Sequence, residues 1–125
     1  MKHGLIVKND LYDELYGPDE INDISSLVNI YSEPISTEQV LQNPTILRDS
    51  EIIMTEWGSF KFDSNILEYL PKLKAVFYAG GSIKNIVSED FWENEIIISS
   101  AYGANAVSVA QYTVSQIISC LKRIW

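Results

Sequence analysis

The sequence has little of the side chains that most often catalyse reactions or bind metals. Its single cysteine, Cys120, cannot form an internal disulfide and has no metal-binding neighbours in the sequence. Its single histidine, His3, stands beside the amino terminus, where a structural or solvated role is typical. No serine–histidine–acid set can be assembled from these residues. The sequence therefore assigns no catalytic residue and no metal ligand.

Long apolar runs and basic clusters are also missing. No run approaches the roughly 18 apolar residues of a membrane span, and the apolar run after His3 is too short for a secretory signal. Seventeen acidic residues against nine basic ones give a net charge of −8, which repels phosphate backbones. We therefore expect a cytoplasmic protein that binds neither nucleic acid nor membranes.

The glycine fingerprints of nucleotide-binding proteins are absent as well. Neither G-x-G-x-x-G nor G-x-x-x-x-G-K-[ST] occurs in the 125 residues. The pair Asn9-Asp10 after the first apolar run raises the possibility of a phospho-acceptor domain. Such a domain also needs an aspartate after the third strand, where this sequence reads Thr55-Glu56-Trp57. Carboxylates are numerous, but we expect them at helix starts and in loops, where capping and solubility explain them.

Short apolar runs and amphipathic segments alternate about five times along the chain. With 46% hydrophobic residues, the chain is long enough to form one domain with a core. The expected strands are residues 5–8, 27–31, 51–54, 73–79 and 95–100. The expected helix starts are Pro18, a capping box at Ser36 with Gln39, Asp63 and Ser88. This alternation predicts an α/β fold with a parallel sheet covered by helices on both faces.

One turn of this pattern is a candidate binding site. The predicted strand 73–79 ends at Gly80-Gly81-Ser82. A glycine pair lets the backbone adopt positive φ and approach a ligand closely. Ligands of open α/β sheets lie outside the carboxyl ends of the strands, and successive backbone N–H groups form a site for an anion. The alternative interpretation is a tight turn without a ligand.

The last predicted helix is unusually apolar. Asn105 is its expected N-cap, and apolar residues then recur at spacings of three and four to the end of the chain. A five-stranded domain can cover only part of such a helix, so we expect it to pack against another domain or subunit. We predict self-association through residues 106–125, with a symmetric homodimer as the expected form.

The second half of the chain resembles the D-2-hydroxyacid dehydrogenase family. The resemblance covers residues 51–123, and its order and spacing are more specific than any single piece. It rests on residues 55–58, 70–76, 79–84, 96–101 and 104–113. The residues before position 51 are compatible with the family but do not by themselves indicate it.

The resemblance implies a flavodoxin-like substrate-binding domain in residues 1–102, with a five-stranded doubly wound parallel sheet. Residues 103–125 would form the interdomain helix leading to a dinucleotide-binding domain that lies outside this sequence. The full-length enzyme would use NAD or NADP to transfer hydride between nicotinamide and a 2-hydroxy or 2-keto acid. The 125 residues alone would bind no cofactor and would be inactive.

The resemblance also implies roles for particular residues. Backbone N–H groups of Gly80, Gly81 and Ser82 would hold the substrate carboxylate, Trp57 would line the same cleft, and Asn105 would lie near the cofactor. For Trp57, packing at a loop edge is an equally good interpretation. Ser82 to Asn85 depart from the family's usual residues after the turn, which leaves the substrate open. The alternative function is a non-catalytic flavodoxin-like module that binds or assembles through its apolar C-terminal helix.

Overall fold

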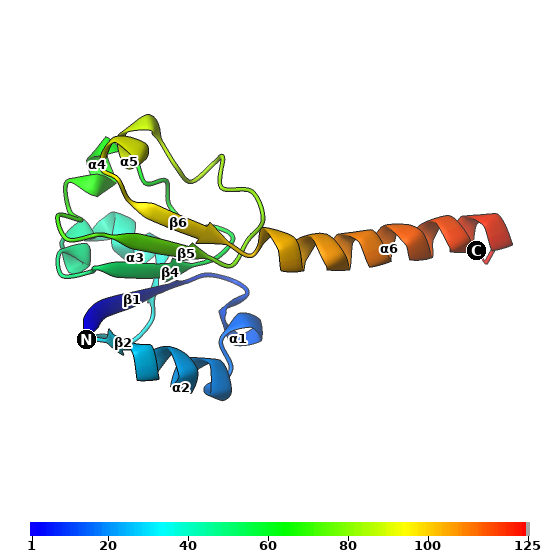
Figure 1. The fold of residues 1–125 in the computed structure, drawn as a ribbon, viewed down its shortest axis with the longest axis horizontal. Helices are drawn as coiled ribbons and strands as arrows, with labels where there is room; N and C mark the ends of the chain where they lie inside the picture. The colour runs from blue at the N-terminus through cyan, green and yellow to red at the C-terminus, as the bar shows by residue number, and fades with distance from the viewer. Residues whose placement is uncertain (125) are drawn as a thin grey trace.

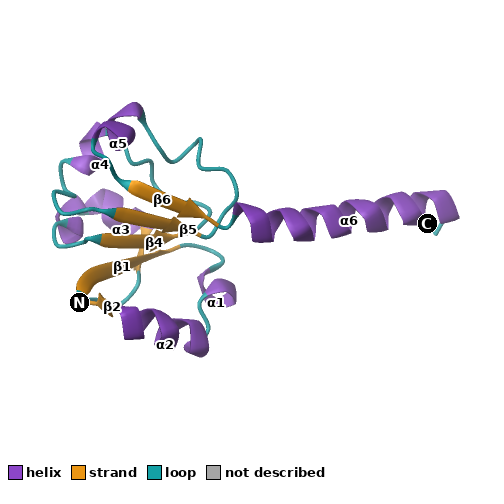
Figure 2. Ribbon diagram, in the orientation of Figure 1, coloured by secondary structure: helices purple, strands orange, loops and turns teal. Residues whose placement is uncertain are grey.

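The computed structural model describes residues 1–124 and contains a parallel β-sheet at its centre (Figures 1 and 2). Its strands are β1 (Lys2–Lys8), β2 (Val28–Ile30), β3 (Ile35–Ser36), β4 (Ile52–Thr55), β5 (Ala75–Tyr78) and β6 (Ile97–Ser100). Five of them lie in the order β2-β1-β4-β5-β6, and the two-residue β3 pairs with the end of β1. With β3 left aside, this is the strand order of the flavodoxin-like fold. The predicted fold class is confirmed.

Helices lie on both faces of the sheet, as the alternating pattern predicts. The described helices of the domain are α1 (Tyr12–Leu15), α2 (Pro18–Leu27), α3 (Thr37–Gln42), α4 (Ser64–Leu67) and α5 (Glu89–Glu93), with a 3-10 turn η1 at Pro44–Leu47. Three predicted N-caps are confirmed. Ser36 and Gln39 form the reciprocal capping box, and Asp63 and Ser88 accept N–H groups of the first turns of α4 and α5.

The two faces of the sheet have separate cores. On one face, Leu5, Val7, Ile53 and Val76 pack against α3, α4 and α5, with Phe62 and Phe91 also in this cluster. On the other face, the buried residues are Ile6, Ile52 and Met54, and the side chains over them come from α1, α2 and β2. The second core is much smaller than the first, so the two helical layers cover the sheet unequally.

Helix α6 (Tyr102–Lys122) projects straight out of the domain from the carboxyl end of β6 (Figure 1). None of its residues is buried. It begins three residues before the predicted start, with Ala101 as its N-cap residue, and the Asn105 backbone N–H donates to the Ala101 carbonyl at 2.9 Å. Asn105 is therefore not the N-cap. Among the described residues, no helix is both long enough and apolar enough to cross a membrane.

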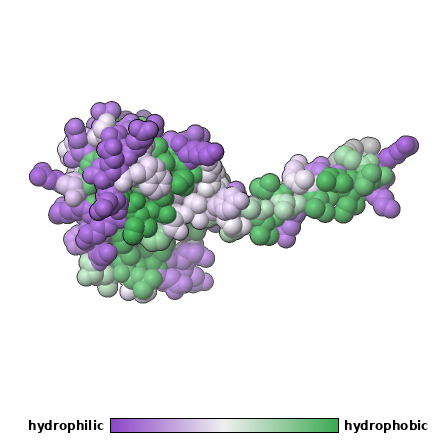
Figure 3. All heavy atoms as spheres, turned by 45° about the horizontal axis from the view of Figure 1, so that its top comes forward, coloured by the Kyte–Doolittle hydropathy of each residue, from purple (hydrophilic) through white to green (hydrophobic). Residues whose placement is uncertain are grey.

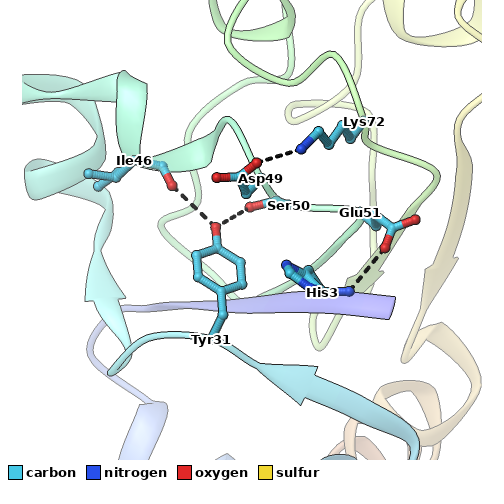
Figure 4. A network of polar contacts seen from close by, with 7 residues as sticks. All are labelled: His3, Tyr31, Ile46, Asp49, Ser50, Glu51 and Lys72. Carbon is cyan, nitrogen blue, oxygen red and sulfur yellow. Dashed lines mark hydrogen bonds and ion pairs between the residues drawn. The ribbon is translucent and has the colours of Figure 1, made fainter. Parts of the chain in front are cut away.

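The amino-terminal edge of the sheet holds a polar network (Figure 4). The Tyr31 hydroxyl lies 2.7 Å from the Ser50 hydroxyl and donates to the Ile46 carbonyl at 3.2 Å. The His3 backbone N–H donates to the Glu51 carboxylate at 3.1 Å, and the His3 ring lies beside Tyr31. His3 is thus placed at the edge opposite to the strand ends where a flavodoxin-like sheet binds its ligands.

Candidate functional site

The predicted site residues lie at the carboxyl edge of the sheet. Trp57 follows β4, Gly80 to Ser82 follow β5, and Asn105 lies in the first turns of α6, which follows β6. Because the strands are parallel and neighbouring, their carboxyl ends meet at one edge. The Ala79 N–H donates to the Thr55 carbonyl at 2.8 Å, and the Ala101 N–H donates to the Tyr78 carbonyl at 2.9 Å. These bonds hold the three connections together where the strands end.

Gly80 is required by the ring of Tyr78. A Cβ atom at position 80 would lie 2.5 Å from Cε1 and Cζ of Tyr78 and 2.6 Å from its hydroxyl oxygen. Such distances are far below van der Waals contact, so any larger residue would displace the ring or the turn. Tyr78 is buried, and burial raises the pKa of its hydroxyl above the ordinary value. The neutral hydroxyl therefore lies directly beside the turn.

Gly81 lies against Asn105. A Cβ atom at position 81 would lie 3.1 Å from Asn105 Nδ2, which is tighter than an ordinary contact. Gly81, expected to bind substrate, therefore lies beside Asn105, which was expected to lie near the cofactor. The expected positive φ at these glycines is wrong, however. Neither Gly80 nor Gly81 has positive φ, and the described glycine that does is Gly58, with φ +86°.

The turn carries unpaired backbone donors, and its accessibility rises along the chain: Gly80 is buried, Gly81 is half-buried and Ser82 is exposed. In the described part of the chain, the N–H groups of Gly80, Gly81 and Ser82 donate to no protein acceptor. Ser82 is exposed, and its hydroxyl accepts a long hydrogen bond of 3.5 Å from the Lys84 N–H. Three successive donors at the end of a parallel strand can bind a small anion. Lys84 adds a positive charge two residues further on.

Trp57 forms the neighbouring wall. Its ring centroid lies 6.4 Å from that of Tyr78, with the two ring planes inclined at 54°. Trp57 is 39% exposed, so a large part of the ring remains available to a ligand. The Trp57–Tyr78 pair connects the loop after β4 to the turn after β5. Both interpretations of Trp57 therefore keep support, since the ring packs on Tyr78 and is also open to solvent.

Glu56 has a role that was not predicted from the sequence. The expectation that carboxylates in loops serve capping or solubility is wrong for this residue. Its side chain is fully buried, at 0% exposure. It accepts the Asn9 N–H at 2.7 Å and the Leu11 N–H at 3.1 Å, and so fixes the loop between β1 and α1. The one feature of the sequence that could have indicated a buried Glu56 is its position directly after the apolar strand β4. A single acidic residue there is enclosed by the neighbouring loops.

The Glu56 carboxylate also affects a nearby tyrosine. Burial raises the pKa of Tyr16 to about 12, with a further contribution from the negative charge of Glu56. Close to this loop, the side chain of Asn9 packs on Gly58, and Nδ2 of Asn9 and the hydroxyl of Thr55 are buried without a partner among the described residues. This part of the edge is polar and enclosed, whereas the glycine turn becomes exposed at Ser82.

The side chains around the glycine turn are suited to binding and orienting an anion. Among residues 1–124, no group of three histidine, cysteine, aspartate or glutamate side chains is placed to hold a metal ion. The side chains that surround the glycine turn are aromatic, amide and hydroxyl groups. They can orient an anion held by the turn, and they do not include a histidine that could exchange protons with it at neutral pH.

No family model matches the chain. A curated relative, the D-3-phosphoglycerate dehydrogenase of Methanocaldococcus jannaschii, is 27% identical over 90 residues. The matched segment covers 72% of this chain but 16% of the relative, so the chain spans a small part of that protein's length. This similarity supports a dehydrogenase-like domain and an oxidoreductase relationship at a distance.

Proposed function

We propose that this chain is the substrate-binding domain of an NAD(P)-dependent 2-hydroxyacid dehydrogenase. The observation that carries the proposal is the row of three unpaired N–H groups at Gly80, Gly81 and Ser82, outside the carboxyl end of β5. The distant similarity to a dehydrogenase that acts on a 2-hydroxy acid supports the same assignment. In this proposal residues 1–102 bind the acid, and residues 103–125 form the helix that leads toward the cofactor domain.

The proposed site recognises the part of the substrate that does not react. The three N–H groups bind the carboxylate through charge-assisted hydrogen bonds, which are stronger than neutral ones. Trp57 and the Tyr78 hydroxyl flank the rest of the acid, since both lie beside the turn. Asn105 contacts the turn from α6 and therefore lies on the side from which nicotinamide would approach.

The nicotinamide cofactor would be held by residues outside this sequence. The 125 residues contain no glycine-rich strand-to-helix turn to cradle a pyrophosphate. NAD or NADP would supply the hydride donor or acceptor, and the present residues would orient the acid toward it. We therefore expect no saturable binding of NADH to this chain at micromolar concentrations.

The experiment measures the affinity of the chain for 2-keto acids by calorimetry. Pyruvate and 2-oxoglutarate are the 2-keto acid probes, and 3-phosphoglycerate is added as a 2-hydroxy acid probe. Methyl pyruvate, whose carboxylate is esterified, is the matched control ligand. Gly81→Val pushes a side chain against Asn105 and should weaken binding by about 10-fold to 100-fold, the equivalent of one lost charge-assisted bond. Ser82→Ala keeps every backbone donor and should change the affinity by less than about threefold.

Two results would contradict the proposal. Equal binding of pyruvate and methyl pyruvate would show that the carboxylate is not recognised. Unchanged affinity in Gly81→Val, with an unchanged thermal unfolding midpoint, would show that the turn is a turn and no more.

A second candidate function has its own observation. Helix α6 exposes apolar side chains along its whole described length, which suits a non-catalytic flavodoxin-like module that assembles through this helix. This candidate predicts no binding of any 2-keto acid together with stable association of the chain. The calorimetric series therefore separates the two functions.

A further inference from the structure

The sheet has one half-open face. Two rows of side chains cross it in register: Gly4, Ile52, Ala75 and Ile97, and then Ile6, Met54, Phe77 and Ser99. Helix α2 covers the part over β1 and β2, where its Ile21 and Ile24 pack. Over β5 and β6 nothing in the described chain covers the rows, and Phe77 is 49% and Ile97 69% exposed. On the opposite face, Val76 of the same strand is fully buried.

The open face is also hollowed. A cavity of about 300 Å³ lies between α2 and the strands, and its walls are almost entirely apolar. Ile24 and Leu27 of α2 line one side, and Ile52, Met54 and Phe77 line the other. Apolar side chains gather on the surface of the domain and along the projecting helix (Figure 3). A doubly wound sheet normally carries a helical layer here, so half of one layer is missing.

The same chain has an apolar helix, α6, on which no residue is buried by the rest of the described chain. In the second half of α6, Val114, Ile117, Ile118 and Leu121 follow one another at spacings of three, one and three, and Ile124 comes just after the helix. All five are more than half exposed. Spacings of three and four place such residues on one face of a helix. The helical part of this segment, residues 114–122, is about 14 Å long. A four-residue strand is about 13 Å long, so the segment fits the depth of the open face.

The charges of the two surfaces are complementary. All seventeen acidic residues precede position 96, whereas α6 carries Lys122, is followed by Arg123, and contains no acidic residue. Helices of α/β sheets run antiparallel to the strands they cover. In that orientation Lys122 and Arg123 reach the edge where the strands start. Glu95 stands there just before β6, and Lys74, just before β5, is paired with Glu51.

We propose that residues 114–124 of one copy of the chain cover the open face of β4, β5 and β6 in a second copy. Helix α6 leaves its own domain in a straight line, so it cannot reach its own sheet without breaking (Figure 1). A second copy can supply the same segment without a break. Reciprocal exchange closes a symmetric dimer, the commonest closed assembly. This inference does not rest on the proposed dehydrogenase function.

The native Cys120 allows a direct test, because it is exposed and flanks the apolar stripe of α6. Ser99→Cys combined with Cys120→Ser places one thiol on the sheet face and removes the one on the helix. This variant is mixed with the unmodified chain and treated with a short bismaleimide. The expected product is a heterodimer linked between Cys120 of one copy and position 99 of the other, identified by peptide mass.

Variants that introduce a charge test the same contact without cross-linking. Ile97→Glu lies at an exposed position, so the domain should fold, and the mass in solution should fall from dimer to monomer. Tyr69→Glu, at an exposed aromatic residue outside the open face, and Ser119→Glu, on the polar side of α6, should leave the dimer intact. Three results would overturn the proposal: a monomeric unmodified chain, dimers linked only through Cys120 to Cys120, or an Ile97→Glu variant that remains dimeric.

Discussion

At the scale of single residues, Glu56 shows how a carboxylate can organise a loop from inside the protein. It is fully buried, and it accepts the N–H groups of Asn9 and Leu11 from the loop after β1. Burying a charge is costly unless hydrogen bonds compensate it, and these two bonds provide that compensation. The loop that they fix begins at Asn9, whose side chain lies beside Gly58, the residue after Trp57.

We predict that Glu56→Ala lowers the free energy of unfolding by about 2–4 kcal/mol. The substitution leaves two backbone donors without an acceptor, and each unsatisfied buried group costs about 1–3 kcal/mol. Glu68→Ala, at an exposed position in the domain, should change stability by less than about 0.5 kcal/mol. Urea denaturation of both variants measures the difference. Equal stabilities of the two variants would show that the carboxylate does not hold the loop.

The glycine turn shows what a sequence can and cannot reveal about a residue. The position of Gly80-Gly81-Ser82 after an apolar strand was sufficient to place the turn at the carboxyl edge. The sequence could not show why each position is glycine, because the reason is contact with side chains that the fold brings to the turn. Tyr78 folds over Gly80, and Asn105 reaches Gly81 from α6, which follows a different strand. Positive φ, the expected reason, occurs at Gly58 instead.

At the scale of elements, local signals determined most boundaries. Ser36, Asp63 and Ser88 are N-caps in the structure because each stands where a helix begins and its side chain reaches free N–H groups. The five main strands follow the apolar runs. Strand β3 was not predicted, since two residues give no periodicity. Helix α6 was predicted to start too late, because Asn105 is a good capping residue type but Ala101 occupies the position where the backbone turns.

The connection between β1 and α2 should make the protein sensitive to alkaline pH. Burial and the Glu56 charge raise the pKa of Tyr16 to about 12, above the ordinary 10.0. The folded protein therefore holds this proton more tightly than the unfolded chain. Its contribution to stability is complete below pH 10 and is lost as the pH rises from about 10 to about 12. The loss amounts to roughly 2 kcal/mol.

The prediction is that Tyr16→Phe unfolds with a weaker dependence on pH in that range, because the substituted ring has no proton to lose. Denaturant unfolding between pH 8 and pH 11.5 measures the effect. Tyr112→Phe, at an exposed position on α6, is the control and should follow the unmodified protein. If both variants lose stability alike above pH 10, Tyr16 does not carry the raised pKa.

At the scale of the whole molecule, the chain consists of a flavodoxin-like sheet domain and a helix that extends beyond it. The apolar pattern after Asn105 correctly indicated a helix that its own domain does not cover. What covers it could not be read from the pattern, because apolar periodicity specifies a buried face and not the partner that buries it. The open face over β5 and β6 was also not predicted, since it results from the direction in which α6 leaves the sheet.

The proposed function depends on one part of the molecule, the carboxyl edge of the sheet. The glycine turn, Trp57 and Asn105 come from three connections that meet at the carboxyl edge of the sheet. None of these connections alone indicates a binding site. Together they lie beside the unpaired backbone N–H groups of the glycine turn. The central claim is that these groups bind the carboxylate of a 2-keto acid.

The most direct test is a titration of the ¹⁵N-labelled chain with pyruvate, followed by the amide resonances of each residue. We expect the amides of Gly80, Gly81 and Ser82 to shift most, in a saturable manner, together with the Asn105 side-chain amide. Methyl pyruvate at the same concentrations should leave them in place. Shifts that are absent at the turn, or that fall on the amino-terminal edge around His3 and Tyr31 instead, would contradict the claim.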